Sequence, residues 1–204
     1  TLFFSAIALA ILLASNLCLN AQASTPTQKE LIQQLIESYS NQGTFNGSVL
    51  VAQKGKVIFA GGLGYANMEW KVKNTANTKF YLASISKTFT SVTVMKLIDQ
   101  GKLTLDTRLS DVLKWYRADT GNKITIRQLL NHTSGIANYL NMKGKSIYQV
   151  ADEFGTAPID KLAFAKKYCQ GDLDYEPGTK CNYNNTAYFL LGLIIEEVSC
   201  KTYE

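Results

Sequence analysis

The hydrophobic pattern of the chain begins with one unbroken apolar run. Residues 2–19 are almost wholly apolar and carry no charge, and the small-residue pattern Ala21-Gln22-Ala23 follows at once. Such a run with such an exit is typical of a secretory signal peptide, so we expect residues 1–23 to be a signal peptide cleaved after Ala23. A transmembrane anchor is the alternative, because the run approaches the length that spans a bilayer. Since neither Met nor a basic residue precedes the run, we expect its N-terminus to be incomplete.

The next segment has the period of a helix. Apolar residues within 27–39 recur at the spacing of one helical face. Thr27 precedes this pattern as a possible N-cap, and Glu30 stands three residues on, as a capping box requires. We therefore predict an amphipathic helix that needs a sheet to pack on.

Two β-rich runs follow this helix. They cover Gly47–Gln53 and Lys56–Ala60, and Lys54-Gly55 between them has the composition of a hairpin turn. The pair predicts an antiparallel hairpin that can supply the required sheet.

A second helical pattern follows a short run at Lys79–Leu82 that resembles the end of a strand. From Ser84 to Gln100 the apolar positions are those of an amphipathic helix, and Gly101 is a suitable stop. Ser84 is therefore predicted to lie at a helix N-terminus, directly after a strand.

The rest of the chain predicts helical segments joined by loops. A short helical turn is expected at Ile126–Leu130, a helix around Ile159–Tyr168 and a final apolar helix at Thr186–Val198. Pro and Gly chemistry predicts a turn at Glu176–Thr179. We thus divide the mature domain, residues 24–204, into a sheet part of about 27–82 and a helical part of about 83–204.

Composition and charge narrow the classes of function. The 204 residues are 46% hydrophobic and 18% charged, which is ordinary for one globular domain. The net charge of +5 is spread out without a run of basic residues, so nucleic-acid binding has no support. His132 is the only histidine and has no neighbouring ligand types, so we expect no metal and no cofactor.

Three cysteines remain after removal of the signal peptide. In an oxidising compartment Cys169 and Cys181 can close a short loop and leave Cys200 unpaired. Three reduced and partly buried thiols are the alternative.

The first candidate catalytic residues lie in the tetrad Ser84-Ile85-Ser86-Lys87 at the predicted helix start. One turn of helix places Lys87 on the same face as Ser84. A serine hydroxyl becomes a good nucleophile only when a base takes its proton, and a lysine can do so where its surroundings lower its pKa. The helix N-terminus adds N–H groups that can stabilise an oxyanion.

A tyrosine beside this lysine suits the second proton transfer, to the leaving group. The pattern Tyr-x-Asn occurs four times, starting at Tyr39, Tyr65, Tyr139 and Tyr183. The first two lie in predicted structural elements, and the third lies in a loop with no strong helix behind it. We therefore select Tyr183 and Asn185, which lie between the Pro-Gly turn and the final helix.

These segments resemble, in order, landmarks of the β-lactamase-related serine hydrolases, a group with class C β-lactamases, penicillin-binding proteins, D-alanyl-D-alanine carboxypeptidases and several esterases. The landmarks are Tyr81–Thr90, Leu129–Ile136, Pro177-Gly178 and Asn184. The resemblance implies that Ser84 is acylated, Lys87 is its base, Tyr183 relays protons and Asn185 donates to a substrate amide. It also implies an α/β fold of the α+β type, with an antiparallel sheet flanked by helices and a helical subdomain.

The chain departs from the family pattern at its end. The third family motif, K-T-G or H-x-G on a later strand, does not occur, and Cys200 stands where Gly is usual. We therefore expect an N-terminal fragment that lacks the C-terminal strands and by itself hydrolyses little.

Two functions remain open from the sequence. The first is an exported serine hydrolase, periplasmic or secreted, that acts through an acyl-enzyme on a β-lactam, a D-alanyl peptide or an ester, without a stable membrane span. The second is a non-catalytic binding or regulatory protein of the cell envelope with the same fold.

A Ser-His-Asp triad built on His132 is not favoured, because the G-x-S-x-G elbow is missing. We interpret His132 as a loop residue with structural hydrogen bonds.

Overall fold

The computed structural model describes residues 25–141, 149 and 159–203. The predicted signal peptide, residues 1–23, lies outside the described residues. The chain divides into two compact units, a sheet unit that ends at Tyr81 and a helical unit that begins at Leu82. In the described ranges no helix has the length and apolar character needed to cross a bilayer.

The sheet unit opens with helix α2, Gln28–Asn41, whose start is fixed by its cap. The Thr27 Oγ1 atom accepts the Glu30 N–H at 3.3 Å, and the Glu30 Oε2 atom accepts the Thr27 N–H at 2.7 Å. These two bonds satisfy N–H groups that have no partner within the helix. The predicted helix and its capping box are confirmed.

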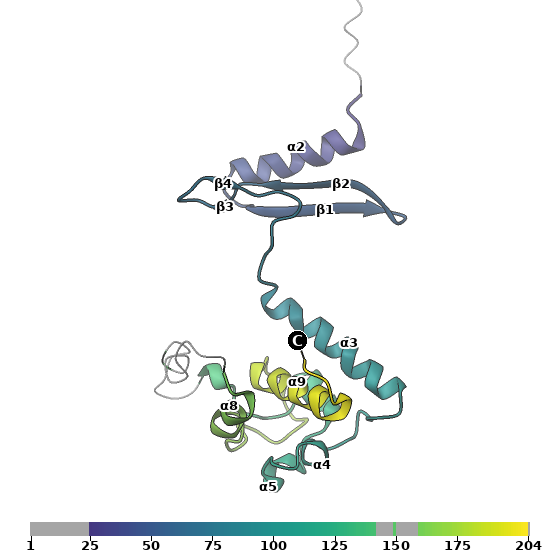
Figure 1. Cartoon of the computed structure of the whole chain (residues 1–204), viewed down its shortest axis with the longest axis vertical. Helices are drawn as coiled ribbons and strands as arrows, with labels where there is room; N and C mark the ends of the chain where they lie inside the picture. The colour runs from purple at the N-terminus through teal and green to yellow at the C-terminus, as the bar shows by residue number, and fades with distance from the viewer. Residues whose placement is uncertain (1–24, 142–148, 150–158, 204) are drawn as a thin grey trace, which may run out of the picture. The chain divides into compact units, whose positions relative to one another are not determined.

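Two antiparallel hairpins complete this unit. Strands β1, Gly47–Gln53, and β2, Lys56–Leu63, pair through a turn in which Lys54 and Gly55 have positive φ of 50° and 76°. The shorter strands β3, Tyr65–Asn67, and β4, Val72–Lys73, form the second hairpin. Helix α2 lies along the first hairpin (Figure 1). The predicted hairpin is confirmed, and β2 continues three residues beyond its predicted end.

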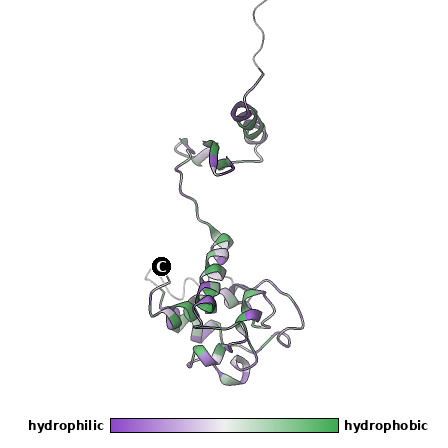
Figure 2. Ribbon diagram, turned by 90° about the vertical axis from the view of Figure 1, so that its right-hand side faces the viewer, coloured by the Kyte–Doolittle hydropathy of each residue, from purple (hydrophilic) through white to green (hydrophobic). Residues whose placement is uncertain are grey.

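The helical unit contains eight helical segments whose bounds the structure describes. They are η1 (Ala83–Ile85), α3 (Ser86–Asp99), α4 (Leu109–Val112), α5 (Ala118–Gly121), α6 (Ile126–Leu130), η2 (Tyr139–Asn141), α8 (Lys161–Tyr168) and α9 (Asn185–Ser199). Hydrophobic and hydrophilic residues are interspersed along the helices (Figure 2). The predicted helices at 84–100, 126–130, 159–168 and 186–198 are confirmed with small shifts of their ends.

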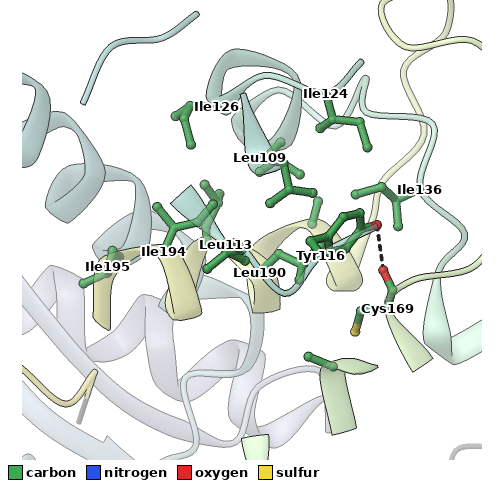
Figure 3. Packing of buried hydrophobic residues seen from close by; sticks show 14 of the residues in the cluster. Leu109, Leu113, Tyr116, Ile124, Ile126, Ile136, Cys169, Leu190, Ile194 and Ile195 are labelled. Atoms are coloured by element: carbon green, nitrogen blue, oxygen red, sulfur yellow. Dashed lines mark hydrogen bonds between the residues drawn. The ribbon is translucent and has the colours of Figure 1, made fainter. Parts of the chain in front are cut away.

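Helix α9 is central to the core of the helical unit. Its residues Leu190, Leu191 and Ile194 are fully buried, together with Leu109 and Ile126 from other segments. Figure 3 shows side chains of this cluster packed around α9. Burial of each such side chain contributes roughly 1.5–3 kcal/mol to folding, so α9 is firmly held against the segments around it.

The structure differs from the sequence-based expectation at one place and selects between two alternatives at another. Residues 79–82 form no strand, because no neighbouring segment pairs with them in the described sheets. Cys169, Cys181 and Cys200 are free thiols, so the structure has the reduced alternative rather than the disulfide. Cys169 is buried, and burial raises the pKa of its thiol to about 12.

Candidate active site

Ser84 and Lys87 lie one turn apart where η1 passes into α3. The Lys87 Nζ atom is 3.3 Å from the Ser84 Oγ atom. Ala83, directly before Ser84, has a φ of +46°, which is unusual for a residue with a side chain. The serine thus follows a backbone position of the kind often found at functional sites.

Tyr183 approaches the same serine from the loop before α9. Its hydroxyl donates a hydrogen bond to the Ser84 Oγ atom at 2.7 Å. The Lys87 Nζ atom lies 4.8 Å from the centre of the Tyr183 ring. Hydrogen bonding with Lys87, and then with Ser84, lowers the pKa of the Tyr183 phenol. The tyrosine side chain is 50% exposed, so the group opens to solvent.

Asn185 is the first residue of α9 and contacts the lysine. Its Oδ1 atom accepts a hydrogen bond from the Lys87 Nζ atom at 2.7 Å. The role predicted for Asn185 is donation to a substrate amide, and the structure adds this contact through the acceptor end of the same side chain. The amine of Lys87 is therefore oriented between Ser84 and Asn185.

The N-terminal cap of helix α9 holds Tyr183 and Asn185 in place. Asn184 is the N-cap, is only 3% exposed, and accepts the Ala187 N–H at 2.9 Å. Its amide nitrogen donates to the carbonyl oxygen of Ile136 in the preceding loop. A buried cap between Tyr183 and Asn185 fixes the backbone from which both side chains project.

The structure brings Ser84, Lys87, Tyr183 and Asn185 together, and it places the other Tyr-x-Asn tyrosines differently. Tyr139 packs edge-on against Phe164 at 5.2 Å, beside the core. Tyr39 lies in α2 and Tyr65 in β3, both in the sheet unit.

Tyr188 also contributes to this group, although no motif in the sequence singled it out. Its ring centre lies 5.6 Å from the Lys87 Nζ atom, and its hydroxyl donates to the carbonyl oxygen of Leu130 at 2.9 Å. The Tyr188 hydroxyl also lies 3.0 Å from the Ser91 hydroxyl, oxygen to oxygen. Tyr188 follows Asn185 by one helical turn, and this spacing is the sequence signal that places both side chains on the same face of the helix.

His132 lies beside this group, and no carboxylate among the residues that the structure describes bonds to it. Its Nδ1 atom accepts the backbone N–H of Asn184 at 3.2 Å, where a catalytic triad would need a donor nitrogen facing an acid. Burial and the positive charge of Lys87 lower the pKa of the imidazole. In the described parts of the chain no three His, Cys, Asp or Glu side chains gather as a metal site would require.

Residues 29–204 match the Beta-lactamase family, and the chain belongs to that family. Protein flp of Staphylococcus aureus is 32% identical over 88% of this chain and 35% of its own length. Penicillin-binding protein 4* of Bacillus subtilis is 30% identical over 86% of this chain and 38% of its own length. The chain thus spans little more than a third of these curated relatives.

Solved structures agree on the fold. A penicillin binding protein from Bacillus halodurans superposes with a TM-score of 0.66 at 29% identity, over 88% of this chain and 51% of that chain. EstCE1, described as a hydrolase with promiscuous acyltransferase activity, gives a TM-score of 0.69 at 31% identity, over 84% of this chain and 47% of that chain. The predicted β-lactamase/transpeptidase fold, with mixed helices and antiparallel sheets, is confirmed.

Proposed function

We propose that the protein is an exported serine hydrolase that forms an acyl-enzyme at Ser84. One observation carries this proposal. The Ser84 oxygen lies 3.3 Å from the Lys87 amine and 2.7 Å from the Tyr183 hydroxyl, so one oxygen has two proton-transfer groups within reach.

The proposed reaction has two steps. The Ser84 oxygen attacks the substrate carbonyl carbon while its proton passes to the Lys87 amine in its neutral form. The proton reaches the leaving nitrogen or oxygen through Tyr183, and the bond from that atom to the carbonyl carbon breaks. Water then attacks the ester carbonyl, its proton returns to Ser84, and the acid is released.

Asn185 and the helix terminus have supporting roles in this scheme. Asn185 orients the Lys87 amine through its Oδ1 atom, which leaves its amide nitrogen to donate to a substrate amide. The N-terminal end of α3 favours the negative charge that develops on the substrate oxygen.

The substrate class is proposed as a small acyl donor: a β-lactam, a D-alanyl peptide or an ester. The names of the relatives support this range, since they include penicillin-binding proteins and a hydrolase with acyltransferase activity. Export to the periplasm or the medium is proposed from the apolar run that ends at Ala21-Gln22-Ala23. A non-catalytic envelope protein is less well supported, because it has no need of two proton-transfer groups at one serine oxygen.

A substrate panel tests the proposal. The protein, expressed from its complete open reading frame, is assayed with a chromogenic β-lactam, a D-alanyl-D-alanine peptide and an aryl ester. We expect turnover of at least one substrate, which disappears in Ser84→Ala and persists in Ser86→Ala. No turnover of any of the three, or turnover unchanged in Ser84→Ala, contradicts the proposal.

A further inference from the structure

His132 lies between two aromatic rings of the candidate active site. Its imidazole centre is 4.7 Å from the Tyr183 ring centre and 5.1 Å from the Tyr188 ring centre. Both tyrosines also have Lys87 within 6 Å of their rings. His132 is therefore packed against the residues that surround the lysine, and its own hydrogen bond is to the backbone of Asn184.

The imidazole holds the backbone between two site residues. The hydrogen bond from the Asn184 N–H to the His132 Nδ1 atom, 3.2 Å long, fixes the peptide that joins Tyr183 to Asn184. An N–H donor requires a lone pair on Nδ1, so the proton of the neutral ring must lie on Nε2. Protonation of Nδ1 would turn this attraction into a contact between two N–H groups.

The backbone of His132 reinforces this contact. Its φ of +63° turns the chain so that its carbonyl oxygen accepts the Asn182 N–H at 2.9 Å. The carbonyl oxygen of the next residue, Thr133, accepts the Gly178 N–H at 2.8 Å. The loop that carries Tyr183 is thus joined to the His132 loop at several points.

Resting on the proposed function, we infer that His132 is a positioning residue whose neutral imidazole holds Tyr183 and Asn185 in place, and whose protonation slows acylation of Ser84. It does not take part in proton transfer. It acts by keeping the Tyr183 hydroxyl and the Asn185 amide at Ser84 and Lys87.

The groups around the imidazole agree with a neutral ring. Lys87 faces it from α3, the phenols of Tyr183 and Tyr188 flank it, and the Tyr175 hydroxyl donates to its carbonyl oxygen at 3.4 Å. Burial, and then the positive charge that Lys87 carries when it is protonated, lower the pKa of His132 from its ordinary value of 6.5. Both causes favour the neutral ring.

Two substitutions of His132 separate its positioning role from its titration. In His132→Asn the side-chain Oδ1 atom can take the place of Nδ1 as acceptor, asparagine tolerates a positive φ, and the amide does not titrate. In His132→Gln the acceptor lies one bond further out, so the bond to Asn184 is lost while the residue stays polar and uncharged. The two variants thus differ in the contact at issue and in their tolerance of the positive φ of position 132.

The rate at which a fluorophosphonate phosphonylates the Ser84 oxygen, with release of fluoride, is measured from about pH 4.5 to 8.5, across the range where histidine titrates. We expect a fall on the acid side for the wild type and a flatter profile for His132→Asn. At neutral pH we expect His132→Gln to be slower than the wild type by about 10²-fold, the typical effect of a misplaced site, and His132→Asn to recover most of that rate. This difference should narrow on the acid side, where the protonated wild-type ring has lost the same contact. Identical acid limbs in the wild type and His132→Asn, or a His132→Gln variant as fast as the wild type, overturn the inference.

A second measurement does not depend on activity. In a long-range proton–nitrogen NMR spectrum, the His132 signals are those absent from His132→Asn. At neutral pH we expect the tautomer with its proton on Nε2. When the pH is lowered, we expect the chemical shift of the Asn184 amide to change with the same midpoint as the imidazole signals. A proton on Nδ1 at neutral pH overturns the inference. If the wild type is not acylated at all, the proposed function fails, and this spectrum still decides whether His132 holds Asn184.

Discussion

At the scale of single residues, the site is defined by what surrounds the Ser84 oxygen. Lys87 and Tyr183 both reach it, and Asn185 fixes the amine from the other side. Each of these contacts is within the reach required for proton transfer or orientation. The roles of the two proton-transfer groups can be separated by substitution.

Replacement of the lysine tests its role as base. Lys87→Met keeps most of the side-chain volume but removes the amine, and loss of a general base typically lowers a rate by about 10²–10⁴-fold. We expect a fall of that size in the rate of Ser84 acylation. Lys96→Met, on the last turn of the same helix, is the control and should change the rate by less than about twofold, as is usual for surface substitutions. Equal rates for the two variants contradict the assignment.

Removal of one hydroxyl tests the tyrosine. Tyr183→Phe retains the ring that packs on His132 but loses the hydrogen bond to the Ser84 oxygen, so we expect acylation to slow by about 10²-fold or more. Tyr139→Phe changes the tyrosine of another Tyr-x-Asn pattern, which packs beside the core, and should leave the rate nearly unchanged. Stopped-flow labelling of both variants gives the comparison. A larger loss in Tyr139→Phe would show that Tyr183 is the wrong tyrosine.

At the scale of elements, the site is the meeting of two helix starts. Ser84 comes from η1, Lys87 comes from the start of α3 directly after it, and Asn185 comes from the start of α9. The position of α9 depends on its buried cap, Asn184. A cap can therefore influence the chemistry as well as the stability.

Removal of two different caps separates these effects. Asn184→Ala deletes the cap of α9 and leaves buried partners unsatisfied, so we expect the free energy of unfolding to fall by about 2 kcal/mol and acylation to slow markedly. Asp160→Ala deletes the exposed cap of α8, which should lower stability by about 1 kcal/mol and leave the acylation rate unchanged. Denaturant titration and labelling measure the two quantities. A normal acylation rate in folded Asn184→Ala contradicts the role assigned to this cap.

Local sequence signals predict these elements well where the signal is itself local. The capping box of α2 and the turn at Lys54-Gly55 involve neighbours in sequence, and both are present. The strand expected at Lys79–Leu82 is absent, because a strand needs a partner that its own sequence does not specify. The sequence pattern places the start of α9 one residue late, although Asn184 has the composition of an N-cap.

The candidate site also combines features that are local in sequence with contacts between distant residues. The spacing of Ser84 and Lys87 is visible within one helical turn. The contact of His132 with Asn184 joins residues 52 positions apart, and no local pattern reports such a contact. The interpretation of His132 as a loop residue with structural hydrogen bonds is confirmed, but its place beside Tyr183 is visible only in the structure.

At the scale of the whole molecule, burial in the helical unit can be measured through its cysteines. Cys169 is buried in the core and its thiol pKa is raised to about 12, whereas Cys181 and Cys200 are exposed. Under native conditions iodoacetamide should modify Cys181 and Cys200, and Cys169 should react only after unfolding, because the thiolate is the reactive form. Peptide mapping after alkylation measures each site. Rapid native modification of Cys169, or a disulfide between Cys169 and Cys181, contradicts this packing.

Family membership extends across nearly all of the chain, yet the chain spans only part of each relative's length. The fold is shared with a penicillin binding protein and with a hydrolase described as having promiscuous acyltransferase activity. A common fold does not choose among substrates. Our proposal for this chain concerns the nucleophile, which we propose to be Ser84.

The most direct test is therefore to locate the acyl group. The protein is incubated with a penicillin and, separately, with a fluorophosphonate, and each product is digested and sequenced by mass spectrometry. We expect one adduct per chain, on the Ser84 oxygen, absent from Ser84→Ala and present in Ser86→Ala. An adduct on any other residue, or no adduct with either reagent, would contradict the assignment of Ser84 as the nucleophile.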